Sequence, residues 1–160
     1  MQEASEKIQE IILDAKMPAD IKNAIVDSYD DMNVDQAISK VIGSNALNSF
    51  IKSGRELPFV AVRSSATAED QADASFAGQQ ATYLNVKGKD ELVLAVQKCW
   101  ASLFTARAIY YRVKNNYPHE KVYIAVVVQK MVNSEKSGIM FSVNPATNNE
   151  TEIMIECGLG

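Results

Sequence analysis

The sequence has little cysteine, little histidine and a deficit of positive charge. Its 160 residues include two Cys, one His and 16 Lys plus Arg against 20 Asp plus Glu, for a formal net charge of −4. A negative chain lacks the basic stripe that contact with a nucleic-acid backbone requires. Its apolar runs are far shorter than the roughly 20 residues of a membrane helix. We therefore expect neither nucleic acid nor a membrane among its partners.

The two cysteines and the single histidine do not by themselves suggest a metal or catalytic site. Cys99 and Cys157 belong to no CxxC or Cys/His cluster, so both are interpreted as free thiols of a reducing compartment. The N-terminus lacks the basic and uninterrupted apolar regions of a signal peptide, which favours a cytoplasmic protein. His119 follows Pro118 without any nucleophile motif nearby. We predict that it is a solvated loop residue and not catalytic.

The length is that of one ordinary domain. Its N-terminal and C-terminal parts differ in the spacing of their apolar residues. In residues 1–57, apolar residues recur at helical spacing, which predicts helices over about 8–15 and 19–32. Two further short helices are expected within 34–42 and 45–52. This helical N-terminal part contains no cluster of residues that suggests chemistry.

Strands prevail in residues 58–160. One long helix is predicted over 89–114, with apolar residues in a continuous stripe. Strand and helix patterns intermix, which indicates an α+β or α/β architecture. The chain ends directly after a strand pattern, as an incomplete domain is expected to do. The strands are expected over 58–66, 81–86, 121–132, 137–145 and 151–159.

Arg63 is the first candidate for ligand binding. It ends the apolar run FVAV and is followed by Ser64 and Ser65. A guanidinium presents a planar fork of donors that matches phosphate oxygens, and the hydroxyls add further donors. A phosphate cradle and an ion pair of Arg63 with Glu69 or Asp70 explain the pattern about equally well.

Four weaker candidates follow along the chain. Gly78 in SFAGQQ allows close approach of a ligand to the backbone, although such a glycine is more often an ordinary turn. Thr82 offers a hydroxyl to phosphate or magnesium, or is an ordinary strand residue. Gln129 places an amide at the end of an otherwise apolar strand, where we expect it to be buried and to find its partners equally in a bound ligand or in the neighbouring backbone. With Met131, this strand end could be a hinge that binds a purine base.

Other charged residues are interpreted structurally. The acidic residues Glu69, Asp70 and Asp73 are separated by alanines and have no second ligand cluster, so a solvated loop is favoured over a metal site. Arg107 and Arg112 are five residues apart on the predicted long helix. Salt bridges on the helix surface explain them at least as well as a ligand does.

Several long strings together resemble a known family: VAVRSSATAEDQADASFAGQQATYLNV, KCWASLFTARAIYYR, HEKVYIAVVVQKMV and SGIMFSVNPAT. They resemble the N-terminal nucleotide-binding domain of the phosphoenolpyruvate synthase and pyruvate phosphate dikinase family. The resemblance implies an ATP-grasp-like α+β domain with a mostly antiparallel sheet, over residues 58–160. It also implies that Arg63 contacts phosphate, that Gly78 and Thr82 line the phosphate side, and that Gln129 and Met131 lie near the adenine.

Enzymes of that family use ATP, Mg²⁺ and pyruvate, and they transfer a phosphoryl group through a histidine on a separate domain. Nothing here resembles the histidine or pyruvate domains, nor the flanking segments that carry the family's ATP-binding lysine and its magnesium and ribose ligands. The resemblance therefore implies part of an ATP site, inactive alone and without catalytic or metal-ligating residues. Rifampin phosphotransferases carry a similar stretch and are an alternative. A non-catalytic association module, self-associating through exposed sheet edges, is another.

Overall fold

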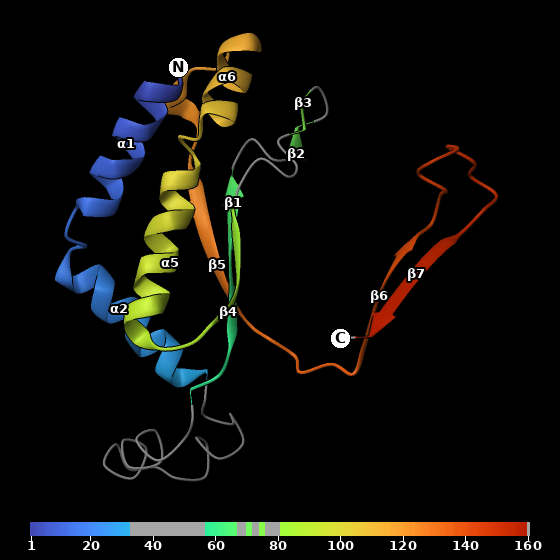
Figure 1. Cartoon of the computed structure of the whole chain (residues 1–160), viewed down its shortest axis with the longest axis horizontal. Coiled ribbons are helices and arrows are strands. Elements are labelled where there is room, and N and C mark those ends of the chain that lie inside the picture. Colours follow the sequence, from blue (N-terminus) through green and yellow to red (C-terminus); the bar gives the residue numbers. More distant parts are fainter. Residues whose placement is uncertain (33–56, 67–69, 72–73, 76–80, 160) are drawn as a thin grey trace.

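The computed structural model describes residues 1–32, 57–66, 70–71, 74–75 and 81–159. These residues form an α+β fold with antiparallel strands (Figure 1). The helices predicted within 34–42 and 45–52 lie outside the described residues. The elements are α1 Gln2–Asp14, α2 Ala19–Asp31, β1 Val60–Ala66, β2 Asp70–Gln71, β3 Ala74–Ser75, β4 Thr82–Val86, α5 Lys89–Ser102, α6 Ala106–Lys114, the 3₁₀ helix η1 His119–Lys121, β5 Ile124–Lys130, β6 Lys136–Phe141 and β7 Met154–Leu159.

The main sheet has three strands in the order β4-β1-β5, and both pairings are antiparallel. Strand β1 is central, and its seven residues pair continuously with β5 from Val60↔Lys130 to Ala66↔Ile124. Its pairing with β4 shifts register between Val60 and Val62. The predicted strand positions are confirmed, each within a few residues.

One face of this sheet forms the hydrophobic core. Val60 and Val62 of β1 are fully buried, and they pack with Leu92, Val96 and Cys99 of α5. Alternate side chains of a strand point to opposite faces, so the intervening residues of β1 lie on the other face. The helices α1, α2 and α5 all lie on the core side of the sheet (Figure 1). The N-terminal helices and the sheet therefore share one core.

Tyr29 connects three of these elements. Its side chain is 1% exposed, and its hydroxyl donates to the Pro58 carbonyl at 2.7 Å and accepts from the Gly88 N–H at 3.1 Å. Gly88 precedes α5 with a φ of 103°, a conformation that residues other than glycine rarely adopt. A single buried phenol thus fixes the end of α2 against the starts of β1 and α5.

The prediction of one long helix over 89–114 is wrong in one respect, because the helix is interrupted between α5 and α6. The Thr105 side chain accepts a hydrogen bond from the Ala108 N–H and caps the second helix. The Phe104 carbonyl accepts hydrogen bonds from Ser5 and Gln9 of α1 instead of continuing the helix. The apolar stripe continues across the break, so periodicity alone does not reveal it.

By length and composition, the stretch 89–114 is the one helical segment among the described residues that could cross a membrane. Half of its most apolar 18-residue stretch is buried inside the fold. The buried face of α5 packs on β1, β4 and β5, as a core helix does.

Strands β6 and β7 form a separate two-stranded hairpin, paired from Lys136↔Leu159 to Phe141↔Met154. It stands away from the helices and the main sheet, joined to β5 by the chain after Lys130 (Figure 1). Most of its side chains are exposed, including Ile139, Phe141 and Ile155. Isolated hairpins are only marginally stable in water. The exposed apolar side chains of this hairpin form a surface suited to packing against another element.

Candidate nucleotide-binding face

The candidate site is the face of the main sheet opposite the core, called here the open face. None of the described helices covers it (Figure 1). It carries the outward residues of β1, which are Ala61, Arg63 and Ser65, with their cross-strand neighbours on β4 and β5. Four of the five residues predicted to bind nucleotide lie on this face or at its end.

Arg63 lies at the centre of the open face. It is the register partner of Thr82 on β4 and of Val127 on β5. Directly opposed residues of antiparallel strands have Cβ atoms about 4.5–5.5 Å apart, so the guanidinium stem and the Thr82 hydroxyl lie side by side. Both side chains are exposed. A cation and a hydroxyl are thus presented together, as an anionic ligand requires.

The two serines after Arg63 point to opposite faces. Ser64 is half-buried, and its N–H and hydroxyl both approach the Ala81 carbonyl at 3.4 Å. Ser65 is exposed and shares the open face with Arg63. Of the two hydroxyls expected to assist Arg63, only that of Ser65 lies on its side of the sheet.

Gln129 also lies on the open face, opposite Ala61 of β1. The expectation that its amide is buried is wrong, because Gln129 is exposed. Among the described strands only β1 lies beside β5, and no described helix covers its outer face, so alternate residues of an apolar-looking strand remain open to solvent. The Gln129 amide can therefore bind a ligand without first losing a hydrogen-bond partner in the core.

Met131 lies just past the end of β5. Its N–H donates to the Phe59 carbonyl at 2.9 Å, which extends the β1–β5 pairing by one step. Its sulfur accepts from the Asn85 N–H at 3.2 Å, so the side chain reaches across to β4. Asn85 has a φ of 58° at the irregular end of that strand. Met131 therefore closes the end of the sheet where the chain leaves toward the hairpin.

The remaining candidates lie outside the described residues. These are Gly78, Glu69, Asp73 and the side chain of Asp70. The ion pair considered for Arg63 falls among them. Within the described part of the chain, no group of three or more His, Cys, Asp or Glu could hold a metal ion. The described residues of the open face include no carboxylate, so they do not fit a magnesium site of their own.

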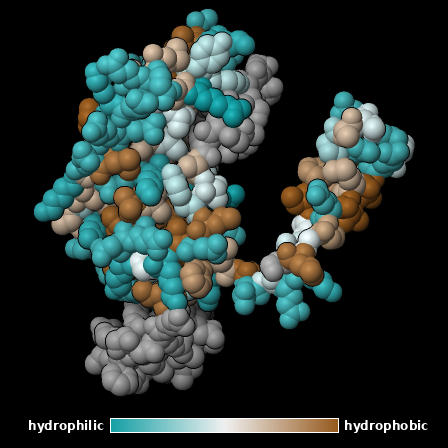
Figure 2. Space-filling view, in the orientation of Figure 1, coloured by the Kyte–Doolittle hydropathy of each residue, from teal (hydrophilic) through white to brown (hydrophobic). Residues whose placement is uncertain are grey.

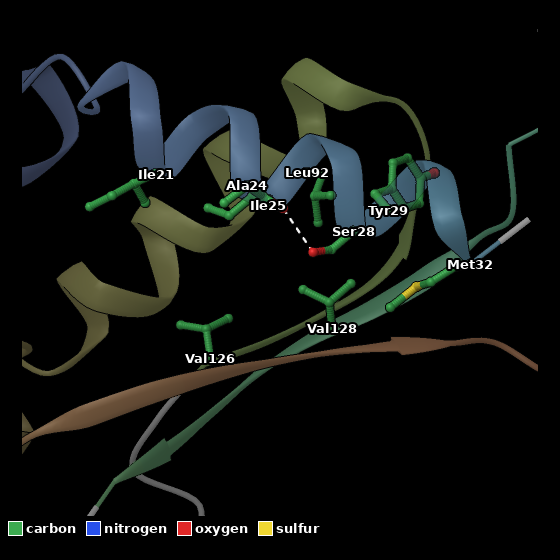
Figure 3. Close-up of a pocket in the computed structure, with 9 residues that line it drawn as sticks. All are labelled: Ile21, Ala24, Ile25, Ser28, Tyr29, Met32, Leu92, Val126 and Val128. Atoms are coloured by element: carbon green, nitrogen blue, oxygen red, sulfur yellow. Dashed lines mark hydrogen bonds between the residues drawn. The ribbon is translucent and has the colours of Figure 1, made fainter. Parts of the chain in front are cut away.

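Two hollows near the sheet differ in chemistry. A pocket of about 300 Å³ is lined by β4 and α5, with Thr82 and Glu91 in its wall and Lys98 over the Tyr83 ring at 5.8 Å. Burial, with a smaller effect of Cys99, raises the pKa of Tyr83. A second pocket of about 400 Å³ lies on the core side (Figure 3). Its lining carries no charge, which does not suit phosphate: Ile21, Ala24, Ile25, Ser28, Tyr29, Met32, Leu92, Val126 and Val128.

The sequence interpretation missed one polar contact. Arg112 was expected on the helix surface and His119 in solvent, yet Arg112 is 1% exposed and its Nε donates to His119 Nδ1 at 2.9 Å. His119 itself is exposed. The apolar spacing of the helix gave no sign that its last turn buries an arginine.

Across from the open face stands the β6–β7 hairpin. The space-filling view shows its apolar side chains and open space between it and the rest of the molecule (Figure 2). Sheet and hairpin are thus two separate surfaces connected near Met131.

Comparison with known proteins identifies the family. The family of the pyruvate phosphate dikinase AMP/ATP-binding domain matches residues 1–160. The chain belongs to this AMP/ATP-binding domain family. The match includes the N-terminal helices as well as the sheet and hairpin.

Similar proteins carry phosphoenolpyruvate synthase names. The domain is 48% identical over 160 residues to the phosphoenolpyruvate synthase of Pyrococcus furiosus, covering 100% of this chain and 18% of that protein. It is also 48% identical over 160 residues to the probable synthase of Methanothermobacter thermautotrophicus, covering 21% of it. It is 65% identical over 107 residues to that of Archaeoglobus fulgidus, covering 67% of this chain and 14% of that protein. The AMP/ATP-binding domain described here thus spans about a fifth or less of these relatives.

Proposed function

We propose that the chain supplies one wall of the ATP site of a phosphoenolpyruvate synthase. The observation that carries the proposal is the pairing of Arg63 with Thr82 on an uncovered sheet face, in a chain of the AMP/ATP-binding domain family. Arg63 and Thr82 bind the phosphates, and Gly78 assists them through its backbone. Gln129 and Met131 lie beside the adenine.

The spacing of the sheet suits an extended nucleotide. The Met131 N–H is hydrogen-bonded to the carbonyl of Phe59, which directly precedes β1 and lies four residues before Arg63. At about 3.3 Å per residue the two ends of the site are roughly 13 Å apart. The cationic end can then bind phosphates while the other end contacts the base. In this proposal the hairpin faces the sheet as a second lobe, and the nucleotide lies between them as in an ATP-grasp-like fold.

The complete enzyme would convert ATP, pyruvate and water to AMP, phosphoenolpyruvate and phosphate, through a phosphorylated histidine outside this chain. His119 is not that histidine in our proposal, because it is the hydrogen-bond partner of Arg112. Pyruvate binds in the rest of the longer protein. Magnesium binds with the phosphates, and its protein ligands lie outside the described residues of the open face. The free thiols Cys99 and Cys157 are compatible with a cytoplasmic enzyme.

The two alternatives are less well supported. The similar proteins named above are phosphoenolpyruvate synthases, which disfavours a rifampin phosphotransferase. A non-catalytic association module is suggested only by the exposed hairpin and by β4 and β5, which are the edge strands of the sheet in the described part of the chain. Light scattering after size exclusion tests self-association, because a dimer through these edges should dissociate on dilution.

Amide chemical shifts test the placement of the nucleotide. On titration of the ¹⁵N-labelled chain with Mg–ATP, amides of the open face around Arg63, Thr82 and Gln129 should shift most, and those of α1 should stay unchanged. Adenosine alone should move only the Met131 end. Shifts confined to the apolar pocket of Figure 3, around Ile25 and Val128, would contradict the proposed face.

A further inference from the structure

Arg112, in the last turn of α6, has a buried guanidinium that is only partly satisfied. Its Nε donates to His119, but Nη1 and Nη2 are buried and have no hydrogen-bond partner among the described residues. A buried arginine normally pairs with an anion, because burying an uncompensated charge is costly. The two Nη groups, which carry four of the five N–H donors of the guanidinium, are thus left without acceptors in the interior.

The surroundings of Arg112 offset this cost only in part. The Phe104 ring lies 5.5 Å from the guanidinium carbon, and the C-terminal end of α6 carries partial negative charge. Neither accepts a hydrogen bond from Nη1 or Nη2. The ion pairs of the described residues join other side chains, with no carboxylate on Arg112. Burial lowers the pKa of Arg112, as expected for a cation short of compensation.

The 3₁₀ helix η1 lies against the Arg112 side chain through His119. The turn after α6 is tied back to the helix by the Tyr117 N–H, which donates to the Arg112 carbonyl at 2.8 Å. The residues of η1 are themselves exposed, whereas Tyr117 before it and Val122 after it pack in a small apolar cluster with Leu103. This cluster adjoins the site through the Phe104 ring, which packs on it and lies beside the guanidinium of Arg112. An anion entering past η1 would find a dry, positively charged site.

We propose that Arg112 is the centre of an oxyanion-binding site, in which Nη1 and Nη2 hold two oxygens of a carboxylate or phosphate-type group. Two parallel N–H donors match two oxygens of such a group, and the pairing is strong where water is excluded. His119 keeps the guanidinium oriented by accepting from Nε. The site lies on α6, whereas the proposed nucleotide residues lie on the sheet, so it does not depend on the ATP assignment.

Thermal unfolding of the whole chain tests the site with simple anions. Sodium acetate and sodium phosphate are each compared with sodium chloride at matched ionic strength. The midpoint should rise saturably with at least one oxyanion, and the two salts distinguish carboxylate from phosphate preference. Arg112→Met should lose this response, whereas Arg107→Ala, which removes an exposed arginine of the same helix, should keep it. Parallel responses of wild type and Arg112→Met would overturn the proposal.

Two further measurements cover the remaining outcomes. If Arg112→Met does not fold, calorimetric titration of phosphate and acetate into wild type and Arg63→Ala decides, and the absence of saturable heat overturns the site. Glu120, one residue from His119, is the nearest carboxylate in sequence. If wild type gives no response and Glu120→Gln gains one, Glu120 itself fills the fork, and the site for an external anion is refuted.

Discussion

Arg63 and Thr82 are register partners on β1 and β4, and both are exposed on the face of the sheet that the helices leave uncovered. They are 19 positions apart in sequence, and the fold places a cation and a hydroxyl next to each other. This relationship connects the family membership of the chain to a specific surface.

The Thr82 hydroxyl should contribute modestly to ATP affinity. Thr82→Val keeps the branched shape that suits a strand and removes the hydroxyl. Because Thr82 is exposed to water, losing the hydrogen bond from its uncharged hydroxyl to phosphate should cost about 0.5–1.5 kcal/mol, roughly a two- to tenfold rise in Kd. Fluorescence titration with a labelled ATP analogue measures this. An unchanged Kd would remove Thr82 from the site.

The two cysteines should differ sharply in reactivity. Cys99 is fully buried and burial raises its pKa to about 11, whereas Cys157 is exposed. The thiolate is the reactive form, so at pH 8 a disulfide reagent should label one thiol quickly in the folded chain and a second only in denaturant. Fast labelling of two thiols in the native chain contradicts the buried position of Cys99.

Alkaline pH should destabilise the chain partly through Cys99. The unfolded thiol ionises near 9.0, but the folded thiol stays protonated until about 11. Between these values the unfolded state has lost a proton that the folded state keeps, so the free energy of unfolding falls as pH rises. Tyr83, whose pKa is also raised, acts in the same direction. Urea unfolding from pH 8 to 11 should show a shallower decline for Cys99→Ala than for wild type.

Removing one oxygen from Tyr29 should weaken the core. Tyr29→Phe leaves the Pro58 carbonyl and the Gly88 N–H without their shared partner, and we expect a loss of about 1–3 kcal/mol in the free energy of unfolding. Tyr110→Phe is the matched control, since Tyr110 is 55% exposed. Equal stabilities of the two variants in urea would show that the Tyr29 hydroxyl contributes nothing.

Much of the architecture could be predicted from local sequence patterns. The short apolar run before Arg63 and the alternating segment TYLNV have patterns typical of strands. They lie in β1 and β4 of the structure. The spacing of apolar residues around Tyr29 likewise predicted α2. Positions at strand ends and the family resemblance together identified four candidate residues: Arg63, Thr82, Gln129 and Met131.

The remaining features depend on tertiary contacts that no local pattern carries. The break at Thr105 exists because α1 uses the Phe104 carbonyl, which is about 95 residues away in sequence. Gln129 is exposed because nothing described covers its face of β5. Arg112 is buried because the chain after α6 folds back over it and brings His119 to its Nε.

The most direct measurement is calorimetric titration of Mg–ATP into the wild-type chain, Arg63→Ala and Arg107→Ala. Arg107 is an exposed arginine on α6 away from the open face, and its replacement removes the same charge. We predict saturable binding that Arg63→Ala weakens by about 1.5–3 kcal/mol, the scale of a charged hydrogen bond, while Arg107→Ala leaves it unchanged. Equal affinities of the two variants, or no binding by a folded wild-type chain, would contradict the account.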